Sequence, residues 1–236
     1  MSIKFAERMN KVQKSFIREI LKVTENPNII SFAGGLPNPL SFPIKEVEEA
    51  SIKVLNENGS DVLQYSTTEG YRPLREYIAQ RYLKRFGLKV DADEILITNG
   101  SQQGLDLLGK IFLNKDDNVL IERPGYLGAI QAFSIFEPVF NSVLVNNDGV
   151  DIDLLEKSLA MNSPKLFYTV PNFQNPSGTT YSEKNRKAAA DILKKYDTIL
   201  IEDDPYGELR FIGEDLQPIK TYLGDKSVML GSFSKI

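Results

Sequence analysis

The sequence predicts an α/β fold in which a mostly parallel β-sheet is flanked by helices. From residue 94 onward, short runs rich in β-branched residues alternate with longer segments of helical periodicity. Such regular alternation favours parallel strands joined by right-handed crossover helices, which cover both faces of the sheet. No internal repeat and no low-complexity linker interrupts this pattern.

The segments before the sheet are expected to be helical and extended. Residues 5–25 carry apolar side chains at helical spacing. The stretch 26–43 is rich in Pro and Gly and is expected to be loop or extended chain. Helical patterns return at 44–57 and 71–87, and the second of these ends at Gly87.

The sheet itself is expected from six short apolar runs, at residues 94–98, 118–122, 139–145, 165–170, 198–202 and 227–232. Helices fit between them, near residues 101–113, 125–136, 151–161 and 182–196. In sheets of this kind ligands bind beyond the carboxyl ends of the strands. The residues that follow each run are therefore the candidates for function.

Composition narrows the possible chemistry. The chain has 236 residues, of which 42% are hydrophobic and 25% charged, and it contains neither Cys nor His. A thiolate nucleophile, a cysteine zinc site and a Ser-His triad are thereby excluded. Proton transfer is left to Lys, Tyr, Asp, Glu or a cofactor.

Charge and hydropathy indicate where the protein works. The net charge of −4, without a dense basic run, argues against nucleic-acid binding. No apolar run approaches the roughly 18 residues of a membrane span. The charged, amphipathic N-terminus lacks the apolar region of a secretory signal, so the cytoplasm is the expected location and no membrane partner is expected.

The first strand ends offer ligand groups that also have ordinary structural explanations. After 94–98, the segment "NGSQQG" opens a helix whose N–H groups and dipole suit a phosphate, although Ser101 alone could be a simple N-cap. Tyr126 follows the second strand, where a packed aromatic is the alternative. Asn172 and Asn175 follow the fourth strand in a turn-rich loop.

The last two strand ends add acids, a phenol and a lysine. Asp203, Asp204 and Tyr206 follow 198–202, and two acids without a His make a poor metal site. "SFSK" ends at Lys235. One rim would thus combine a phosphate-sized helix terminus, an aromatic ring, an amide, an acid, a phenol and a lysine. That set suits pyridoxal 5'-phosphate.

Longer motifs carry a family resemblance along nearly the whole chain. The chain resembles the class I/II aminotransferases of fold type I, and more narrowly the 2-aminoadipate and multi-substrate aminotransferases. The resemblance rests on "IREILK", "ISFAGGLPNPLSFP", "LQYSTTEGYRPLRE", "EILITNGSQQGLDLLGKIF", "NFQNPSGTTYS", "IEDDPYGELRF" and "LGSFSK", which occur in the family's order.

The resemblance implies how the cofactor's phosphate and ring are held. Ser101 and Gln102 would bind the phosphate through their backbone N–H groups, with help from Ser232 and Ser234. Tyr126 would stack on the pyridine ring.

The resemblance also assigns the groups around the reacting part of the cofactor. Asn175 and Tyr206 would hydrogen-bond the 3'-oxygen, and Asn175 would also border the substrate. Asp203 would pair with the pyridinium nitrogen, since the family places that acid three residues before the tyrosine, which excludes Asp204. Lys235 would be the Schiff-base lysine and the base that moves the α-proton.

Three further assignments concern the partner subunit and the substrate. Tyr65 resembles the tyrosine that reaches the phosphate in the partner's site, which implies a homodimer with shared sites. Arg18 lies where relatives carry an arginine that faces the substrate side chain, although a solvated helix charge explains it equally well. Gly34 and Gly35 lie in a loop that lines the same pocket in that family.

The implied reaction moves an amino group between an L-amino acid and a 2-oxo acid by a ping-pong mechanism. The donors it suggests are 2-aminoadipate, glutamate, branched-chain and aromatic amino acids. Another reaction of the same cofactor, such as elimination or decarboxylation, stays open, and so does a non-catalytic ligand-sensing domain. A nicotinamide site is excluded because no G-x-G-x-x-G follows the first strand.

The resemblance also predicts the domain plan. Residues 1–60 would form a helix and an extended arm at the active-site entrance, and residues 61–236 the cofactor-binding large domain. The family continues beyond its lysine with two arginines, a small domain, and a strand that lies between its first strand and the one ending at the lysine. We therefore expect residues 1–236 to be part of a longer polypeptide or a truncated product.

Overall fold

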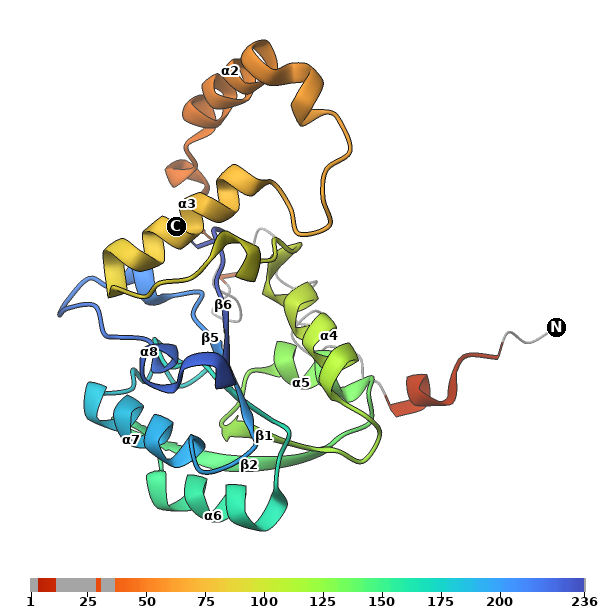
Figure 1. Ribbon diagram of the computed structural model, residues 1–236, viewed down its shortest axis with the longest axis vertical. Coiled ribbons are helices and arrows are strands. Elements are labelled where there is room, and N and C mark those ends of the chain that lie inside the picture. Colours follow the sequence, from red (N-terminus) through yellow and green to blue (C-terminus); the bar gives the residue numbers. More distant parts are fainter. Residues whose placement is uncertain (1–3, 12–28, 31–36, 236) are drawn as a thin grey trace. The chain divides into compact units, whose positions relative to one another are not determined.

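The computed structural model describes residues 4–11, 29–30 and 37–235 (Figure 1). The chain divides into two compact units, residues 13–68 and the remainder, and each is considered by itself. In the smaller unit, η2 (Pro39–Ser41) precedes α2 (Ile44–Val62), which has a non-helical residue at Asn58. The helix expected at 44–57 is thus confirmed and runs further. Of the helix expected at 5–25, only the 3-10 turn η1 (Glu7–Lys11) lies within the described residues.

A six-stranded sheet forms the centre of the larger unit. Its order is β3-β2-β1-β4-β5-β6, and all neighbours are parallel except β3, which is antiparallel to β2. The mostly parallel sheet expected from the sequence is therefore confirmed. The strands are β1 (Asn118–Arg123), β2 (Val139–Asn146), β3 (Gly149–Val150), β4 (Leu166–Thr169), β5 (Ile199–Asp203) and β6 (Ser227–Leu230).

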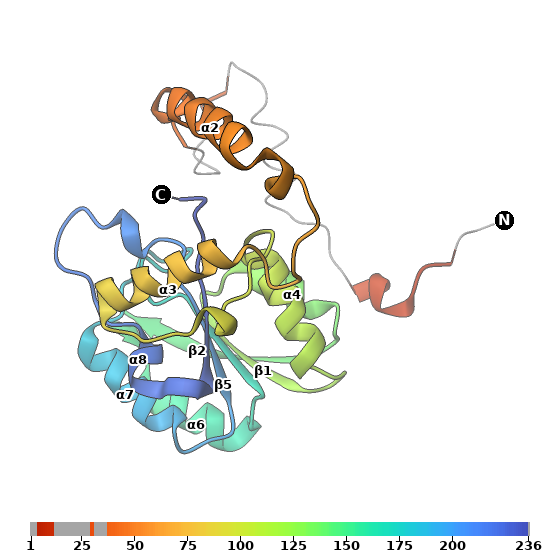
Figure 2. The same ribbon diagram turned by 45° about the horizontal axis from the view of Figure 1, so that its top comes forward.

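Helices cover both faces of this sheet (Figures 1 and 2). One face is packed by α4 and α5, and the other by α6, α7 and α8, so the pleat sends alternate strand residues into two separate cores. Leu200 joins the α7 core, whereas its neighbour Ile201 joins the α4 core. The helices are α3 (Arg72–Phe86), α4 (Gly100–Phe112), α5 (Leu127–Ser134), α6 (Ile152–Asn162), α7 (Glu183–Leu193) and α8 (Ile219–Leu223).

Local sequence explains where several helices begin and end. The Asp151 side chain accepts a hydrogen bond from Leu154 N at the start of α6, and Ser182 accepts one from Asn185 N at the start of α7. Each such N-cap contributes about 1 kcal/mol. Gly87 ends α3 with a φ of 64°, a left-handed conformation that glycine adopts without strain.

One expected strand is wrong. Residues 95–98 of "EILIT" follow the 3-10 turn η3 (Ala92–Glu94) and belong to no strand. Ile97 N instead donates to Glu69 O at 2.9 Å. An apolar run becomes a strand only where a neighbour offers its backbone, and within the described part of the chain β6 pairs with β5 alone. The sequence did not predict β3 and α8, because elements of two and five residues are too short to show a periodic apolar pattern.

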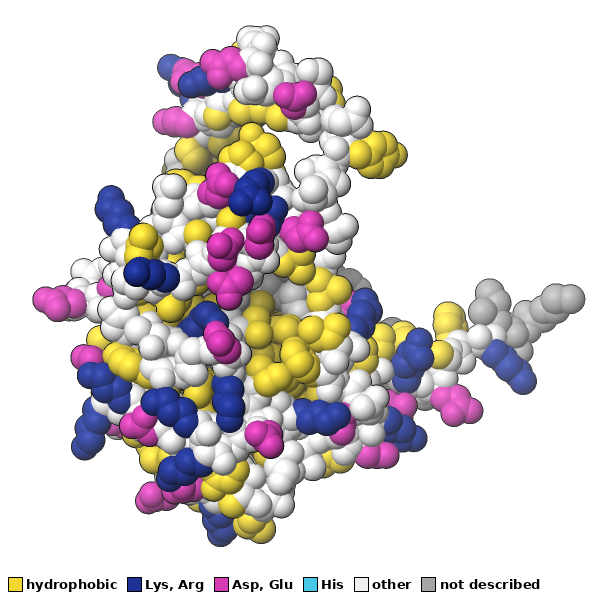
Figure 3. Space-filling model, viewed as in Figure 1, with side chains coloured by type: hydrophobic (Ala, Val, Ile, Leu, Met, Phe, Trp, Pro, Cys, Tyr) yellow, Lys and Arg dark blue, Asp and Glu magenta, His cyan; other side chains and the backbone are white. Residues whose placement is uncertain are grey.

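The surface of the described residues mixes both signs of charge. On the face drawn in Figure 3, Lys and Arg side chains alternate with Asp and Glu, and hydrophobic side chains gather between β6 and α4. Over the same described ranges, no helix combines the length and apolarity needed to cross a membrane.

Candidate functional site

The candidate site lies at the carboxyl edge of the sheet. Four adjacent strands, β1, β4, β5 and β6, point the same way, so the residues that follow them meet at one edge. The chain passes from β1 to β2 on one side and returns to β4 on the other, which makes this a topological switch point, where ligands bind in such sheets. The turn after β5 is fastened to β6, because Asp204 N donates to Leu230 O at 2.9 Å.

Asp203 is the buried acid of the site. It ends β5, is only 2% exposed, and accepts a hydrogen bond from the Tyr168 hydroxyl on Oδ2 at 2.7 Å. Burial raises the pKa of the Asp203 carboxyl to about 6, while the hydroxyls of Tyr168 and the nearby Ser101 oppose that rise. Ser101 does not reach hydrogen-bond geometry at Oδ1, which is buried and has no partner among the described residues. That oxygen can accept an N–H from a ligand.

Tyr126 lies close to this acid on the α4 side of the sheet. Its ring stacks against Tyr168, with centroids 6.4 Å apart and planes 26° from parallel. Burial and the neighbouring charge of Asp203 raise the pKa of the half-buried Tyr126 phenol. An aromatic face and a buried carboxylate therefore occupy one corner of the edge.

The N-terminus of α4 lies beside Ser101 and is the predicted phosphate site. Asn99, the N-cap residue, makes no side-chain cap, so the first-turn N–H groups lack that partner. Gly100 has a φ of 75°, and no described atom lies within 4 Å of where a Cβ would project. The Gln102 amide donates to Gly128 O at 3.2 Å and ties the turn to α5. The first-turn N–H groups and the dipole at a helix N-terminus form an arrangement that phosphate favours.

Two loops bring an amide and a phenol together at the same edge. Asn175 follows β4 and Tyr206 follows β5, and Asn175 Nδ2 lies 3.4 Å from the Tyr206 hydroxyl. The Asp204 carboxylate is occupied elsewhere, because its Oδ1 accepts from Asn172 Nδ2 and Gly207 N, both at 2.9 Å. The choice of Asp203 over Asp204 as the acid that faces a ligand stays a prediction.

A second buried acid, Glu122, supports these loops. It is 1% exposed and accepts hydrogen bonds from Thr169 Oγ1 at 2.5 Å, the Tyr181 hydroxyl at 2.6 Å and Gln174 Nε2 at 2.9 Å. Burial raises the pKa of the Glu122 carboxyl, and these donors oppose that rise. Gln174 also donates to Pro124 O at 2.8 Å, which joins the segment before Tyr126 to the loop that carries Asn175.

Sequence analysis missed three buried side chains that support the site. Tyr168 lies within a strand buried on both faces, where a phenol must find a partner. Glu122 is the last buried residue of β1 and precedes the exposed Arg123. Arg186 lies on α7 with Ala189, Ala190 and Leu193, which are all buried, so helical spacing alone places it on the buried face.

The remaining predicted residues lie at the chain end, in the other unit, or outside the described residues. Lys235 follows β6 and is exposed, and just before it Ser234 N donates to the Ser232 hydroxyl at 3.1 Å. Tyr65 belongs to the smaller unit and is 98% exposed. Arg18, Gly34 and Gly35 lie outside the described residues. In the described ranges no group of three or more acids could hold a metal ion.

Comparisons with known proteins agree on one family. The profile of the family "Aminotransferase class I and II" matches residues 28–236. The aromatic-amino-acid aminotransferase 1 of Thermococcus litoralis is 42% identical over 98% of this chain and 57% of its own length. The chain thus spans less than two thirds of this curated relative.

Solved structures give the same result. The kynurenine aminotransferase of Pyrococcus horikoshii, in complex with PMP, is 41% identical with a TM-score of 0.91, over 98% of this chain and 59% of that one. The α-aminoadipate aminotransferase of Thermus thermophilus, complexed with N-(5'-phosphopyridoxyl)-L-leucine, is 41% identical with a TM-score of 0.87, over 98% and 58% of the two chains.

Proposed function

Because the chain belongs to the aminotransferase class I and II family, we propose that it forms the cofactor-binding part of a pyridoxal 5'-phosphate-dependent aminotransferase. The observation that carries this proposal is the carboxylate of Asp203, which is buried with Oδ1 unpartnered beside a stacked aromatic ring. A buried acceptor of this kind is costly unless a ligand completes it. The protonated pyridine nitrogen is a donor of the right chemistry.

The other residues fit the remaining parts of the cofactor. The N–H groups of Ser101 and Gln102 would bind the phosphate at the open start of α4, with Ser232 and Ser234 as further donors. The ring of Tyr126 would stack on the pyridine.

The 3'-oxygen would be held by the amide and phenol that already lie together. Asn175 Nδ2 and the Tyr206 hydroxyl are 3.4 Å apart, so one acceptor between them could engage both. Lys235 would form the covalent bond to the cofactor from the neighbouring strand end.

In catalysis the chain's residues hold and move protons. When bound, pyridoxal phosphate supplies an electron sink for the bond that breaks at the substrate α-carbon. Asp203 Oδ1 would accept a hydrogen bond from the N–H of that ring, whose positive charge would lower the pKa of Asp203 from the value of about 6 that it has in the cofactor-free protein. Lys235 Nζ would be the base that accepts and returns the substrate α-proton, which needs neither His nor Cys.

We further propose the substrate class and the assembly. The relatives' names point to 2-aminoadipate, kynurenine and aromatic amino acids as donors, to which glutamate and branched-chain amino acids are added as candidates. Arg18 and Gly35 would face the substrate side chain, and Asn175 would border it. Tyr65 would reach the phosphate in the partner's site of a homodimer.

A half-reaction tests the function. The protein that carries this chain is loaded with pyridoxal phosphate and given one amino acid from a panel, without any 2-oxo acid. We expect one equivalent of the 2-oxo acid product per site, and continued turnover only after 2-oxoglutarate is added. Product formation that continues without an acceptor would instead indicate elimination or decarboxylation, and ligand binding without any product would indicate a sensing domain.

A further inference from the structure

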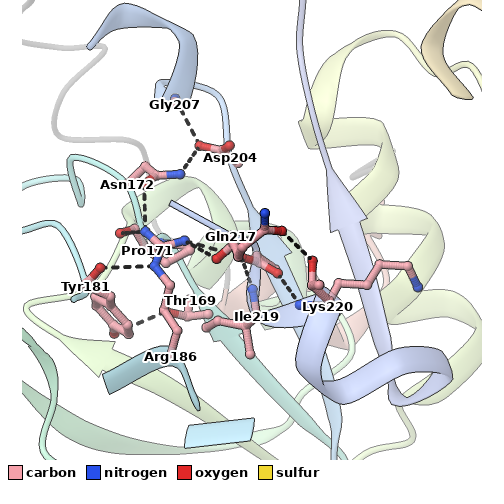
Figure 4. A network of polar contacts seen from close by, with 12 residues as sticks. Thr169, Pro171, Asn172, Tyr181, Arg186, Asp204, Gly207, Gln217, Ile219 and Lys220 are labelled. Atoms are coloured by element: carbon pink, nitrogen blue, oxygen red, sulfur yellow. Dashed lines mark hydrogen bonds and ion pairs between the residues drawn. The ribbon is translucent and has the colours of Figure 1, made fainter. Parts of the chain in front are cut away.

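The guanidinium of Arg186 joins two loops of the candidate site from within the protein. Arg186 is 0% exposed and is among the largest fully buried side chains in the described part of the chain. Its Nε donates to Tyr181 O at 3.0 Å, and its Nη2 donates to Pro171 O at 2.9 Å and to Asn172 Oδ1 at 2.7 Å (Figure 4). One helix residue thus fixes both ends of the segment between residues 171 and 181.

The link continues through Asn172 to the turn after β5. The Oδ1 of Asn172 accepts from Arg186, while its Nδ2 donates to Asp204 Oδ1 at 2.9 Å. The same carboxylate oxygen accepts from Gly207 N at 2.9 Å (Figure 4). A continuous chain of hydrogen bonds therefore runs from α7 through the Asn172 loop to the turn that contains Tyr206.

The charge of Arg186 is balanced from the other side. Glu202 Oε1 lies 3.9 Å from Arg186 Nη1, and the Glu202 carboxylate also accepts from Ile219 N and Lys220 N, both at 2.9 Å. Nη1 donates in addition to Gln217 O at 3.3 Å. A buried guanidinium that is costly to desolvate is thus held in one orientation by acceptors around its plane.

We propose that Arg186 is a positioning residue of the active site, whose guanidinium acts through Asn172 and Asp204 to fix the distance between Asn175 and Tyr206. This inference rests on the function proposed above, in which those two side chains hold the 3'-oxygen of the cofactor. The loop after β4 has no regular element, and the turn after β5 has only the short 3-10 helix η4 (Gly207–Leu209), so their relative position depends on such cross-links. Arg186 itself does not touch the cofactor.

Two variants break the link at different points. Arg186→Lys keeps a positive charge near Glu202, but a single ammonium cannot reach acceptors spread around a planar fork. Asn172→Ala leaves the backbone contacts of Arg186 intact and removes the bridge to Asp204, together with the contact from Arg210 Nη2 to Asn172 Oδ1 at 3.4 Å. The second variant keeps the test decisive if the first fails to fold.

Asn185→Ala is the matched control. Asn185 is the neighbour of Arg186 on α7, is 7% exposed, and donates to Val150 O at 2.8 Å. Val150 lies on β3, at the opposite edge of the sheet from β5 and β6. This control loses a buried amide hydrogen bond of similar size without touching the loops of the site.

Three readouts separate positioning from simple destabilisation. In the cofactor-free protein, we expect amide exchange at Gly207 to become about tenfold faster in both test variants, as the loss of roughly one hydrogen bond allows. With pyridoxal phosphate, we expect the dissociation constant to rise about three- to tenfold. The pH midpoint of the bound cofactor's visible absorbance should move upward, since weaker donors stabilise the 3'-oxygen anion less.

Comparison with Asn185→Ala decides whether Arg186 positions the loops or only stabilises the fold. Asn185→Ala should lower the melting temperature yet leave Gly207 exchange, the dissociation constant and the absorbance midpoint unchanged. If Arg186→Lys and Asn172→Ala behave like Asn185→Ala in all three readouts, the proposed positioning role is wrong. If the wild-type protein binds no pyridoxal phosphate, the proposed function fails, but the exchange rate at Gly207 still tests the link itself.

Discussion

At the scale of single residues, Asp203 shows most clearly how burial changes the chemistry of a side chain. Its carboxyl is enclosed at the end of β5, with a pKa raised to about 6 by burial and only one oxygen hydrogen-bonded. A carboxyl whose pKa is higher in the folded than in the unfolded state binds its proton more tightly when folded. The stability it adds is therefore complete below its unfolded pKa and is lost as the pH rises through the folded pKa.

We predict a pH-dependent stability difference between the cofactor-free wild type and Asp203→Asn. Between about pH 4 and pH 7 the wild type should lose about 2–3 kcal/mol of unfolding free energy relative to the variant, since a shift of about two units corresponds to that energy. Urea titrations at several pH values measure it. Burial raises the pKa of Glu202 to about 7. Glu202 is present in both proteins, so its contribution to the pH dependence cancels in the difference. A difference that stays constant with pH would contradict the assigned burial of Asp203.

Tyr168→Phe should move the pH-dependent loss of stability caused by Asp203 to higher pH. The Tyr168 hydroxyl donates to Asp203 Oδ2 and so favours the ionised carboxyl. Its removal should raise the pKa of Asp203 further and shift the loss of stability to higher pH. Tyr222→Phe is the control, because that hydroxyl bonds the exposed Glu183. An unchanged midpoint in Tyr168→Phe would show that the phenol does not stabilise the charge.

At the scale of secondary-structure elements, α4 holds the proposed phosphate site against two neighbours. Gly104 approaches Leu230 of β6, where an added Cβ would lie 3.1 Å from Cδ2. A Cβ at Gly109 would overlap the ring of Phe136, which follows α5. These close approaches explain why glycines occur inside a helix whose propensity they weaken.

Gly109→Ala should therefore destabilise the fold. The Phe136 ring must move out of a packed core, which typically costs about 1–3 kcal/mol and exceeds the helix-propensity gain of about 1 kcal/mol. Thermal denaturation measures the change. Gly59→Ala is the control, since nothing lies within 4 Å of its Cβ position in α2. Equal or higher stability of Gly109→Ala would show that α4 and α5 are loosely packed.

The elements also show what the sequence can and cannot predict. Alternating patterns placed every strand longer than two residues in the described sheet, because apolar periodicity is local. The run at 94–98 failed because pairing depends on a neighbour distant in the chain. The acceptors of Arg186 could not be predicted for the same reason: they lie on loops up to 31 residues away, although helical spacing alone places Arg186 on the buried face of α7.

At the scale of the whole molecule, the proposed dimer makes a complementation test possible. Tyr65 is 98% exposed and is proposed to serve the partner's site, whereas Lys235 would serve its own. In a mixed dimer of Tyr65→Ala and Lys235→Ala subunits, one site carries both changes and the other carries neither. An equal mixture of the two weak or inactive variants should recover about a quarter of the wild-type rate, because about half of the dimers are hybrids and each hybrid has one intact site. No recovery on mixing would contradict shared sites.

The most direct test of the central claim is to locate the covalent attachment of the cofactor. The protein is incubated with pyridoxal phosphate, reduced with borohydride, digested and analysed by mass spectrometry. We predict one phosphopyridoxyl adduct per chain, on Lys235, which disappears in Lys235→Arg. Adducts spread over exposed lysines such as Lys187 and Lys195, unaffected by Lys235→Arg, would contradict the assignment of this strand end as the reactive site.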